Sequence, residues 1–481
     1  MNIAELNLIA TLPLLFLAVW SCVLLLLGLW IPKHRIQIVG WLAFLGLLVS
    51  IVLLVFNVPL ESQEAFGGML VFDGFALVVH VLLLLSSMLV ILLSFHYIRI
   101  YEKNNSEFYS LLIFSLLGMM ILAVAKNLIV VFLAIELLSI PLYVLVGLDR
   151  DGLRSRESAL KYFLLGAFAS AFQVYGIALV YGATQSTDFV SISLAIASQG
   201  STPLMVSGLG LVLVGFCFKV GVVPFHMWTP DVYEGAPTVV TAFMSVGAKV
   251  AGFAALVRVL FQAFEFLVSQ WAMLVVVLVL FSTIVGNISA ISQSSIKRLL
   301  AFSSVAHAGY LFVAMVAGGQ GVVSDFAASA VLFYLIAYAL ANVGAWAIVI
   351  ALESKNSVNI KDYAGLVKTN PGLAVAMTIF ILSLTGLPPT MGFVAKFYVF
   401  RAAINLGYTW LVIASVITVL ISAYYYLRVI VLMWMKDGNL VIKLPFSFNV
   451  VLVLTSIGTL IFGVFPTPIM LILENYIRGM F

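Results

Sequence analysis

The stretch that decides the fold is GFCFKVGVVPFHMWTPDVYEGAP, Gly215 to Pro237. It begins like an apolar membrane span, but Lys219 lies inside the apolar run and Pro224 interrupts it. Proline removes a backbone donor and clashes with the preceding turn, so the helix must kink or end and leave carbonyl groups for polar partners. A cation beside a broken helix predicts a polar cavity at membrane depth.

The composition of the whole chain places it in a membrane. Charged residues are 9% and hydrophobic residues 64% of the sequence, whereas a typical soluble protein has about 25% charged residues. Cys22 and Cys217, both in apolar runs, supply no disulfide framework and no ligand set for an iron–sulfur cluster or a four-cysteine zinc site. Any electron transfer is therefore expected on another chain. The first six residues lack a basic signal region, so the first apolar run is expected to remain as a span.

Apolar runs of roughly 20 residues, the length that crosses a hydrocarbon core, predict an all-α polytopic membrane protein. The fourteen runs lie at 6–31, 37–58, 74–98, 107–125, 128–148, 159–182, 204–224, 237–264, 269–291, 299–318, 326–352, 371–403, 408–435 and 446–470. An even number of spans places both termini on the same side of the membrane.

The basic residues are distributed unevenly between the two sides. Of the 23 Lys and Arg, sixteen lie in or near loops opposite the termini and only three on the side of the termini. Because short cytoplasmic loops collect Lys and Arg, both termini are expected on the periplasmic side of a bacterial inner membrane. The net charge of +4 then reflects topology and does not indicate a nucleic-acid partner. The four remaining basic residues lie inside predicted spans: Lys219, Lys249, Arg258 and Lys396.

Depth in the membrane separates functional candidates from anchors. Lys249 lies about 18 Å along its helix from Pro237, Glu136 about 12 Å from one face, and His307 about 13–14 Å deep, at 1.5 Å per residue. All three are expected near mid-depth. Arg258 lies closer to the predicted end of its helix, so it is expected to be a snorkelling anchor at the interface.

The span that contains Lys396 is predicted to be interrupted. Lys396 follows Pro371 by about 37 Å of straight helix, which exceeds a hydrocarbon core of roughly 30 Å, and TGLPPT at 385–390 supplies the break. Two interrupted spans, five spans apart, predict two five-helix repeats of opposite orientation. The expected units are a three-helix segment at 1–106, repeats at 107–264 and 265–435, and a C-terminal helix and tail at 436–481.

Polar side chains recur at helical spacing on several spans, as a hydrated path would require. The three sets are Thr241, Ser245 and Lys249; Tyr334, Tyr338 and Asn342; and Ser303, His307 and Tyr310. For any single hydroxyl or amide, hydrogen bonding between packed membrane helices is an alternative explanation. The charged positions favour function, because each central charge costs about 2.5–3.5 kcal/mol; the alternative for Glu136 and Lys219 is a structural salt bridge. His226 is expected near the cytoplasmic mouth, where capping or loop packing is equally credible.

Proton transfer is the chemistry that suits this set of residues. Desolvation weakens the proton affinity of a lysine and a nearby carboxylate strengthens it, so movement of Glu136 relative to Lys219 would switch the lysine between states. Histidines, hydroxyls and water could then relay protons between Lys219, Lys249 and Lys396. The sequence contains no GxSxG, HExxH or phosphate-binding GxxxxGK[ST] pattern, so hydrolysis has no support.

These stretches resemble the antiporter-like membrane subunits of complex I, the proton-pumping NADH–quinone oxidoreductase. The resemblance rests on WTPDVYEGAP at 228–237, FLAIELLS at 132–139, ESALKY at 157–162 and the stretches 304–310 and 392–398. It implies a translocase subunit of fourteen helices, in which Glu136 and Lys219 form a coupled pair. It further implies Lys249 as the connecting lysine, Lys396 as the terminal one and His307 as the histidine that links them.

The resemblance also implies partners and cofactors. The expected partners are neighbouring antiporter-like and small membrane subunits, membrane lipid and, indirectly, a peripheral arm; flavin, iron–sulfur clusters, NADH and quinone are expected on partner subunits, with no cofactor on this chain. The end of the chain soon after the last span, and Lys rather than Glu at 396, favour the subunit N branch. The alternatives are a subunit of a multisubunit sodium/proton antiporter and a non-transporting assembly scaffold that retains buried charges.

Overall fold

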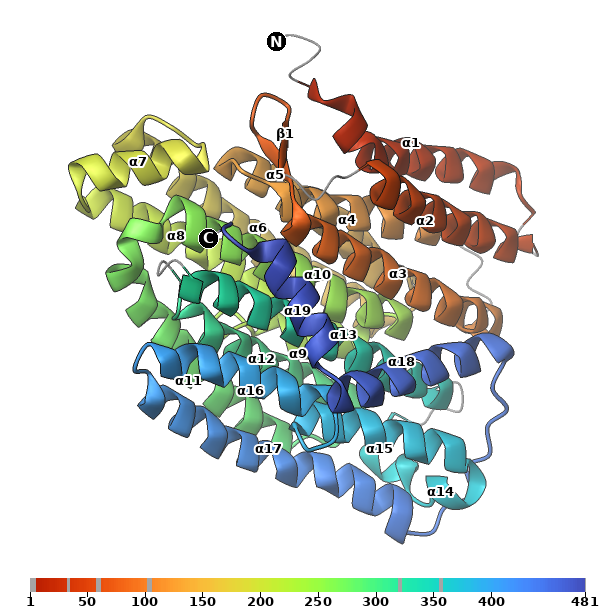
Figure 1. Cartoon of the computed structure of the whole chain (residues 1–481). Coiled ribbons are helices and arrows are strands. Elements are labelled where there is room, and N and C mark those ends of the chain that lie inside the picture. Colours follow the sequence, from red (N-terminus) through yellow and green to blue (C-terminus); the bar gives the residue numbers. More distant parts are fainter. Residues whose placement is uncertain are drawn as a thin grey trace.

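Helices form almost all of the computed structural model, which describes residues 6–32, 35–57, 62–101, 106–318, 322–353 and 358–480 (Figure 1). The helices of the N-terminal half are α1 (Leu8–Trp30), α2 (Gln37–Asn57), α3 (Gly74–Tyr101), α4 (Glu107–Val124), α5 (Leu128–Val146), α6 (Leu153–Thr184), α7 (Phe189–Gln199), α8 (Pro203–Val220), α9 (Trp228–Gly235) and α10 (Thr238–Arg258). Those of the C-terminal half are α11 (Val268–Ile291), α12 (Ile296–Met315), α13 (Val322–Glu353), α14 (Leu366–Thr369), α15 (Pro371–Thr385), α16 (Met391–Asn405), α17 (Thr409–Met435), α18 (Phe446–Val464) and α19 (Thr467–Ile477). A small antiparallel hairpin pairs β1 (Gln63–Ala65) with β2 (Leu70–Phe72).

The predicted spans are confirmed as helices. Thirteen helices in the described residues are long and apolar enough to cross a membrane, and the fourteenth predicted span, 371–403, is divided into α15 and α16. The chain is therefore a multi-pass membrane protein. The predicted span 446–470 is also divided, because α18 ends at Val464 and α19 begins at Thr467 beyond Pro466. The basic residues Lys33, Lys103 and Lys355, which contribute to the predicted orientation, lie outside the described residues.

Both predicted helix breaks are confirmed, and they use the same cap. Gly221 follows the last residue of α8 and Gly386 follows the last residue of α15, with φ of 73° and 86°. In each case the N–H groups of the glycine and of the next residue return to the carbonyl four residues before the glycine, that of Cys217 or Leu382. Glycine suits this left-handed cap because it has no Cβ. A Cβ at Gly386 would also lie only 2.8 Å from Lys396 Cδ.

Three short helices, α7, α9 and α14, lie outside the predicted spans. The four-residue α14 precedes α15, the chain after Pro224 forms α9, and α7 lies in the connection between α6 and α8. Asp188 caps α7 by accepting a hydrogen bond from Ser191 N (2.9 Å), an arrangement that satisfies an otherwise unpaired donor. All three helices are short, at 11, 8 and 4 residues, so a search for membrane-length apolar runs does not detect them.

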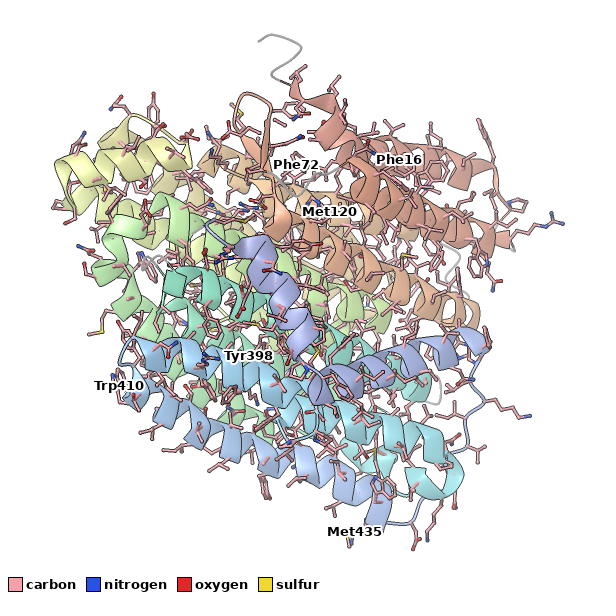
Figure 2. All side chains as sticks on the ribbon, viewed as in Figure 1. Phe16, Phe72, Met120, Tyr398, Trp410 and Met435 are labelled. Atoms are coloured by element: carbon pink, nitrogen blue, oxygen red, sulfur yellow. The ribbon has the colours of Figure 1, made fainter. Side chains whose placement is uncertain are left out.

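The centre of the molecule is formed by helices that are buried on every face. All 21 residues of α10 are buried, and α13 contacts α3, α10, α12, α15, α16, α18 and α19. The outer helices expose large apolar side chains, as lipid-facing helices do. Figure 2 shows Trp410 and Met435 of α17 at the edge of the molecule, with exposed fractions of 53% and 76%, whereas Phe72 and Met120 lie among the helices.

The prediction that Arg258 snorkels to an interface is wrong. A π-helical turn, Val259–Ala263, continues the helix beyond Arg258, so this residue does not lie at the end of its span. Its side chain is fully buried, and Arg258 Nη2 donates to Asp73 Oδ1 of the α3 N-terminus (2.6 Å) while Nε donates to the Ala123 carbonyl (2.7 Å). The guanidinium also lies 5.0 Å from the Phe75 ring centroid. Arg258 therefore joins α10 to α3 and α4.

Candidate functional site

Lys219 lies at the break that the sequence predicted, in the last turn of α8, and is 2% exposed. Its Nζ donates to Ser139 Oγ of α5 (2.6 Å) and to Tyr162 OH of α6 (3.4 Å). Trp228, from the first turn of α9, stacks on the Tyr162 ring with centroids 4.6 Å apart and donates to the Phe218 carbonyl (2.9 Å). Trp228, from the motif after the break, thus packs against Tyr162, which contacts the lysine.

Glu136 does not contact Lys219 directly. It lies half-buried on α5 and accepts a hydrogen bond from Ser170 Oγ of α6. Ser139, one turn further along α5, holds Lys219. Residues three apart on a helix point about 60° apart, so α5 presents the acid to one neighbour and the hydroxyl to another. Glu136 and Lys219, the predicted pair, therefore lie near each other without a hydrogen bond, and Ser139 is the α5 residue that contacts the lysine.

Lys249, in the middle of the fully buried α10, is 3% exposed. Its Nζ donates to the Ser304 carbonyl of α12 and lies 5.5 Å from the Tyr338 ring centroid of α13. Tyr338 OH donates to Ser304 Oγ (3.1 Å), and Asn342 Nδ2 donates to Tyr338 OH (3.2 Å) and to Ser245 Oγ (2.8 Å). Two of the predicted polar faces, on α10 and α13, therefore meet at Lys249.

His307 of α12 lies at the centre of a group of tyrosines and is 4% exposed. Its Nδ1 is 2.7 Å from Tyr334 OH of α13, and its Nε2 is 3.4 Å from Tyr426 OH of α17. The His307 ring lies 5.4 Å from the Tyr338 ring, between centroids. His307 also lines a small cavity of about 10 Å³ together with Leu384 of α15.

Lys396 of α16 lies at the second helix break, where α15 ends. It is 4% exposed, and its Nζ donates to the last two carbonyls of α15, those of Leu384 (3.1 Å) and Thr385 (2.7 Å). The unpaired carbonyls at a helix C-terminus carry partial negative charge and stabilise a cation. The ammonium also lies 4.9 Å from the Tyr310 ring centroid. In the described residues Lys219, Lys249 and Lys396 form no ion pair with a carboxylate.

The hydrogen bonds of Lys219 and those of Lys249 share no residue in the described part of the chain. The two lysines are nevertheless neighbours, because α8 packs closely on α10. A Cβ added at Gly252, one turn from Lys249, would lie 2.7 Å from Val220 Cγ1 and 3.9 Å from Lys219 Cγ. Lys219 and Lys249 thus lie on neighbouring turns of two packed helices, α8 and α10.

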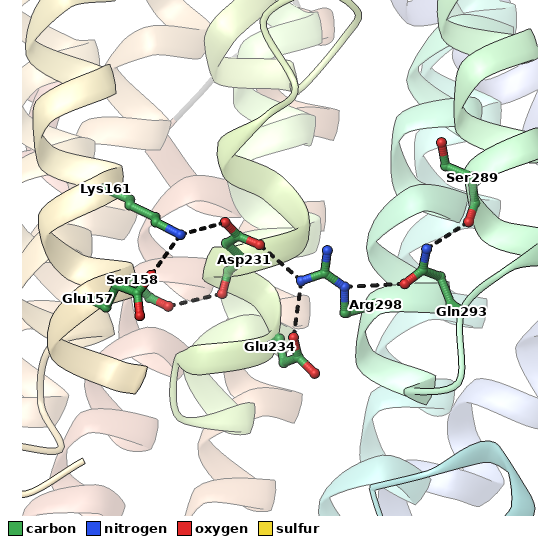
Figure 3. Close-up of polar contacts among 8 residues, drawn as sticks. All are labelled: Glu157, Ser158, Lys161, Asp231, Glu234, Ser289, Gln293 and Arg298. Atoms are coloured by element: carbon green, nitrogen blue, oxygen red, sulfur yellow. Dashed lines mark hydrogen bonds and ion pairs between the residues drawn. The ribbon is translucent and has the colours of Figure 1, made fainter. Parts of the chain in front are cut away.

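An ion-pair network lies at the end of α9, beyond the break (Figure 3). Asp231 accepts hydrogen bonds from Lys161 of α6 (2.8 Å) and Arg298 of α12 (2.9 Å), and Arg298 also reaches Glu234 (3.1 Å). Figure 3 shows Lys161 and Arg298 approaching Asp231 from opposite sides. Partial burial disfavours the charged carboxylate, but these hydrogen bonds outweigh it and hold the pKa of Asp231 below its ordinary value. The network fastens α9 to helices on both sides.

His226 lies in the connection between α8 and α9, apart from the buried lysines. It is half-buried, its ring lies 6.5 Å from that of Phe302, and burial lowers its pKa below the ordinary value against the effect of a hydrogen bond to the Pro224 backbone. The same connection is held by a hydrogen bond from Val223 N to Ser282 Oγ of α11 (3.1 Å). In the part of the chain that the structure describes, His226 forms no hydrogen bond with Glu136 or with the three lysines, so it lies at the mouth of the break.

Several polar residues of the buried site were missed by sequence reasoning. Asn287 of α11 donates to Tyr310 OH (2.9 Å) and accepts from Tyr425 OH of α17 (3.0 Å), and Tyr310 OH contacts Thr418 Oγ1 (3.1 Å). The available signal was the spacing of three or four residues between Ser415, Thr418, Ser422 and Tyr425/Tyr426. In the described residues no group of three or more His, Cys, Asp or Glu side chains is arranged to hold a metal ion.

Comparison with known proteins gives consistent results. A family described as "NADH:quinone oxidoreductase/Mrp antiporter, TM" matches residues 125–422. NADH-quinone oxidoreductase subunit N of Chloroflexus aggregans is 44% identical, over 96% of each chain, and the protein of the same name from Trichlorobacter lovleyi is 40% identical, over 99% of each chain.

Solved structures show the same fold. A chain of respiratory complex I from Thermus thermophilus with bound aureothin has a TM-score of 0.81 and 35% identity, covering 95% of this chain and 98% of that chain. A chain of the Mrp complex from Dietzia sp. DQ12-45-1b has a TM-score of 0.84 at 19% identity, covering 98% of this chain and 96% of that chain, and shows likeness of fold alone.

Proposed function

Because the chain belongs to the subunit N branch of the NADH:quinone oxidoreductase/Mrp antiporter membrane-subunit family, we propose that it translocates protons as a membrane subunit of NADH-quinone oxidoreductase. NADH oxidation and quinone reduction take place on partner subunits, and this chain moves protons through buried lysines and a histidine. Flavin and iron–sulfur clusters belong to those partners.

The observation that carries this proposal is the series of polar contacts through the buried core from Lys249 to Lys396. Lys249 contacts Ser304, whose hydroxyl meets Tyr338; the Tyr338 ring contacts the ring of His307. His307 and Leu384 line the same cavity, and the Leu384 carbonyl binds Lys396. The volume of this cavity, about 10 Å³, is near the lower limit for one water molecule. Five helices contribute to this series, and hydroxyls and imidazole are groups that pass protons.

We further propose that Glu136 controls the first lysine. Its carboxylate lies at the partly exposed surface of α5 and α6, next to the helix turn that holds Lys219. If a partner subunit moved Glu136, the electrostatic environment of Lys219 would change. The partner would not have to enter the buried core to cause this change. Lys219 would then exchange its proton with Lys249 across the close packing of α8 and α10.

The proposed orientation follows the basic loops, with both termini on the periplasmic side of a bacterial inner membrane. A cysteine at Ser62, in the loop before β1, should react with an impermeant thiol reagent from the periplasm, and one at Asp151, between α5 and α6, should react only from the cytoplasm. The opposite labelling would reverse the orientation. The distribution of loop charges is independent of the relay, so this test concerns topology alone.

The test of proton translocation is Lys219→Met in the assembled complex, with Lys436→Met as the control. Methionine keeps an apolar stem and removes the charge, and Lys436 is an exposed lysine just beyond α17. Assembly is measured by the flavin and iron–sulfur chains that copurify, and translocation by NADH-driven acidification of proteoliposomes. We expect Lys219→Met to assemble and to lose at least about tenfold in proton translocation, and Lys436→Met to resemble the wild type. Full pumping by Lys219→Met would refute the proposal, and loss of assembly in step with loss of pumping would favour the scaffold.

A further inference from the structure

Gln173 is a glutamine of α6 whose amide has no hydrogen-bond partner in the part of the chain that the structure describes. The residue is 0% exposed, and neither its Nε2 nor its Oε1 meets a donor or acceptor of the protein. Buried polar groups are normally paired, because burial removes their hydrogen bonds to water. Leucine or methionine would fill the same space at lower cost, so packing alone does not account for the amide.

The amide of Gln173 lies against α8, one helical turn from Lys219. A Cβ added at Gly215 would lie 2.6 Å from Gln173 Oε1 and 2.8 Å from its Cδ, so the glutamine occupies the space beside this glycine. Cβ positions four residues apart on a helix are about 5–6 Å from each other. Helical side chains lean toward the N-terminus of their own helix, which for Lys219 is the direction of Gly215. An extended lysine at 219 therefore reaches the amide oxygen.

Gln173 also lies next to the contact that holds Glu136. Ser170, three residues earlier on α6, donates a hydrogen bond to Glu136 of α5. Residues three apart on a helix point about 60° apart, so α6 presents the serine to α5 and the glutamine to α8. A glutamine amide offers both a donor and an acceptor. It can therefore face an acid on one side and an ammonium group on the other.

The packing of α6 on α8 differs on the two sides of Gln173. Toward the end of α6, a Cβ at Gly176 would lie 2.7 Å from the Gly208 carbonyl oxygen, so the two backbones are in contact there. Toward the helix break, Lys219 of α8 donates to side-chain hydroxyls, those of Ser139 and Tyr162. A lysine side chain has several staggered conformations, so these contacts can exchange without separating the helices.

We propose that Gln173 is a positioning residue that gives Lys219 a second place to bind. In the first place the ammonium group donates to Ser139 and Tyr162. In the second it turns along α8 and donates to Gln173 Oε1, while Gln173 Nε2 faces the contact between Ser170 and Glu136. The amide then transmits the position of the acid to the lysine without an ion pair between them. This inference rests on the proton translocation proposed above.

The first test is Gln173→Met in the assembled complex, with Ser50→Ala as the control. Methionine keeps the length of the side chain and removes the amide. Ser50 of α2 is also 0% exposed and has no hydrogen-bond partner in the described residues, and α2 packs on α1, α3 and α4, away from the buried lysines. We expect Gln173→Met to assemble and to lower NADH-driven proton translocation about tenfold, the effect of one hydrogen bond to a charged group. Ser50→Ala should translocate protons as the wild type does.

Two glycine variants of α8 test the place of the amide without changing it. Alanine at Gly215 would put a Cβ 2.6 Å from Gln173 Oε1, whereas a Cβ at Gly210 meets nothing within 4 Å. We expect Gly215→Ala to displace the amide and to lower proton translocation, and Gly210→Ala to resemble the wild type. Equal translocation by these two variants would contradict the proposal.

A double variant separates a positioning role from a structural one. If the amide transmits the position of Glu136, then Glu136→Gln combined with Gln173→Met should be no more impaired than the worse of the two single variants. Losses that multiply would overturn the proposal, as would wild-type translocation by Gln173→Met. Failure of Gln173→Met to assemble, while Ser50→Ala assembles, would assign the glutamine a structural role and overturn it too.

Lys219→Met separates this inference from the function on which it rests. If Lys219→Met loses proton translocation and Gln173→Met does not, the second binding place for the lysine is excluded and the proposed function stands. If Lys219→Met translocates protons as the wild type does, both are excluded.

Discussion

Removing the charge of Asp73 tests whether the buried ion pair with Arg258 joins α3 to α10. Asp73→Asn is the sharpest change, because Asp73 has two roles at the start of α3. Its Oδ1 accepts the Ala76 N–H (2.8 Å) as a helix cap and also accepts from Arg258 Nη2 (2.6 Å). Asparagine caps helices about as well as aspartate, so the substitution removes the charge and keeps the cap.

The size of the effect follows from burial. The side chains of Arg258 and Asp73 are 0% and 4% exposed, and arginine does not lose its proton in a protein. Breaking a buried pair by removing one partner costs about 3–5 kcal/mol because the other charge stays buried and uncompensated. The Ala123 carbonyl and the Phe75 ring still contact the guanidinium, so we expect the lower value, about 3 kcal/mol. Asp73→Asn combined with Arg258→Met should cost much less than the sum of the single changes.

The assay is a double-mutant cycle on the purified chain, with unfolding followed in mixed detergent–SDS micelles. Lys368→Met and Asp437→Asn form the control cycle, because that pair is exposed, at 65% and 89%, and should show no measurable coupling. A coupling near zero for Asp73 and Arg258 as well would refute the reasoning. Water reaching Asp73 from the adjacent cavity of about 530 Å³, which Asp73 lines, would then be the dominant partner.

Two further predictions concern the lysine at the second break and the network around α9. Lys396→Arg keeps a positive charge but remains protonated at any working pH, so it should impair NADH-driven proton translocation nearly as much as Lys396→Ala; full translocation by the arginine variant would exclude a protonation cycle at this residue. The folded-state pKa of Asp231 lies below its ordinary value, so its stabilising effect is present above about pH 4 and is lost only as the pH falls through the lower folded value. Asp231→Asn should therefore lower the unfolding temperature equally at pH 8 and pH 6, by the equivalent of less than about 1 kcal/mol per pair, and the difference from wild type should shrink below about pH 4; a difference that disappears between pH 8 and pH 6 would contradict this.

The sequence could predict what depends on one helix at a time. The first helix break followed from Pro224 and the second from TGLPPT at 385–390, because proline restricts the backbone in the same way in any context. The buried position of Lys249 followed from its distance along a span, and those of Lys219 and Lys396 followed from the helix breaks beside them. These features require no knowledge of neighbouring helices, and the structure agrees with them.

Features that depend on how helices rotate and pack could not be predicted. Arg258 was assigned to an interface because it lies near the end of its predicted span, 237–264, and its buried partner, Asp73, is 185 residues away in the sequence. Glu136 and Lys219 were expected to act as a coupled pair, and the sequence could not show that the rotation of α5 presents Ser139 to the lysine and Glu136 to Ser170. A single sequence gives the spacing of polar residues on a helix but not the direction in which each face points.

Arg258 and the lysines at the two helix breaks, Lys219 and Lys396, are buried cations that differ in what holds them. Arg258 pairs with a carboxylate, and neither charge can change at low cost, because the loss of one group leaves the other buried and unpaired. Lys219 and Lys396 lie instead at the C-terminal ends of α8 and α15, where carbonyl and hydroxyl oxygens are their partners. A helix end stabilises a cation by about 0.3–1 kcal/mol, and up to about 2 kcal/mol when partly buried, which is less than the 3–5 kcal/mol lost when a buried pair is broken. A lysine at a helix end can therefore release and regain a proton without leaving an orphaned carboxylate, and interrupted helices provide such ends at membrane depth. The pair of Arg258 and Asp73 thus holds helices together, whereas Lys219 and Lys396, at the two helix ends, have the surroundings that the proposed proton exchange requires.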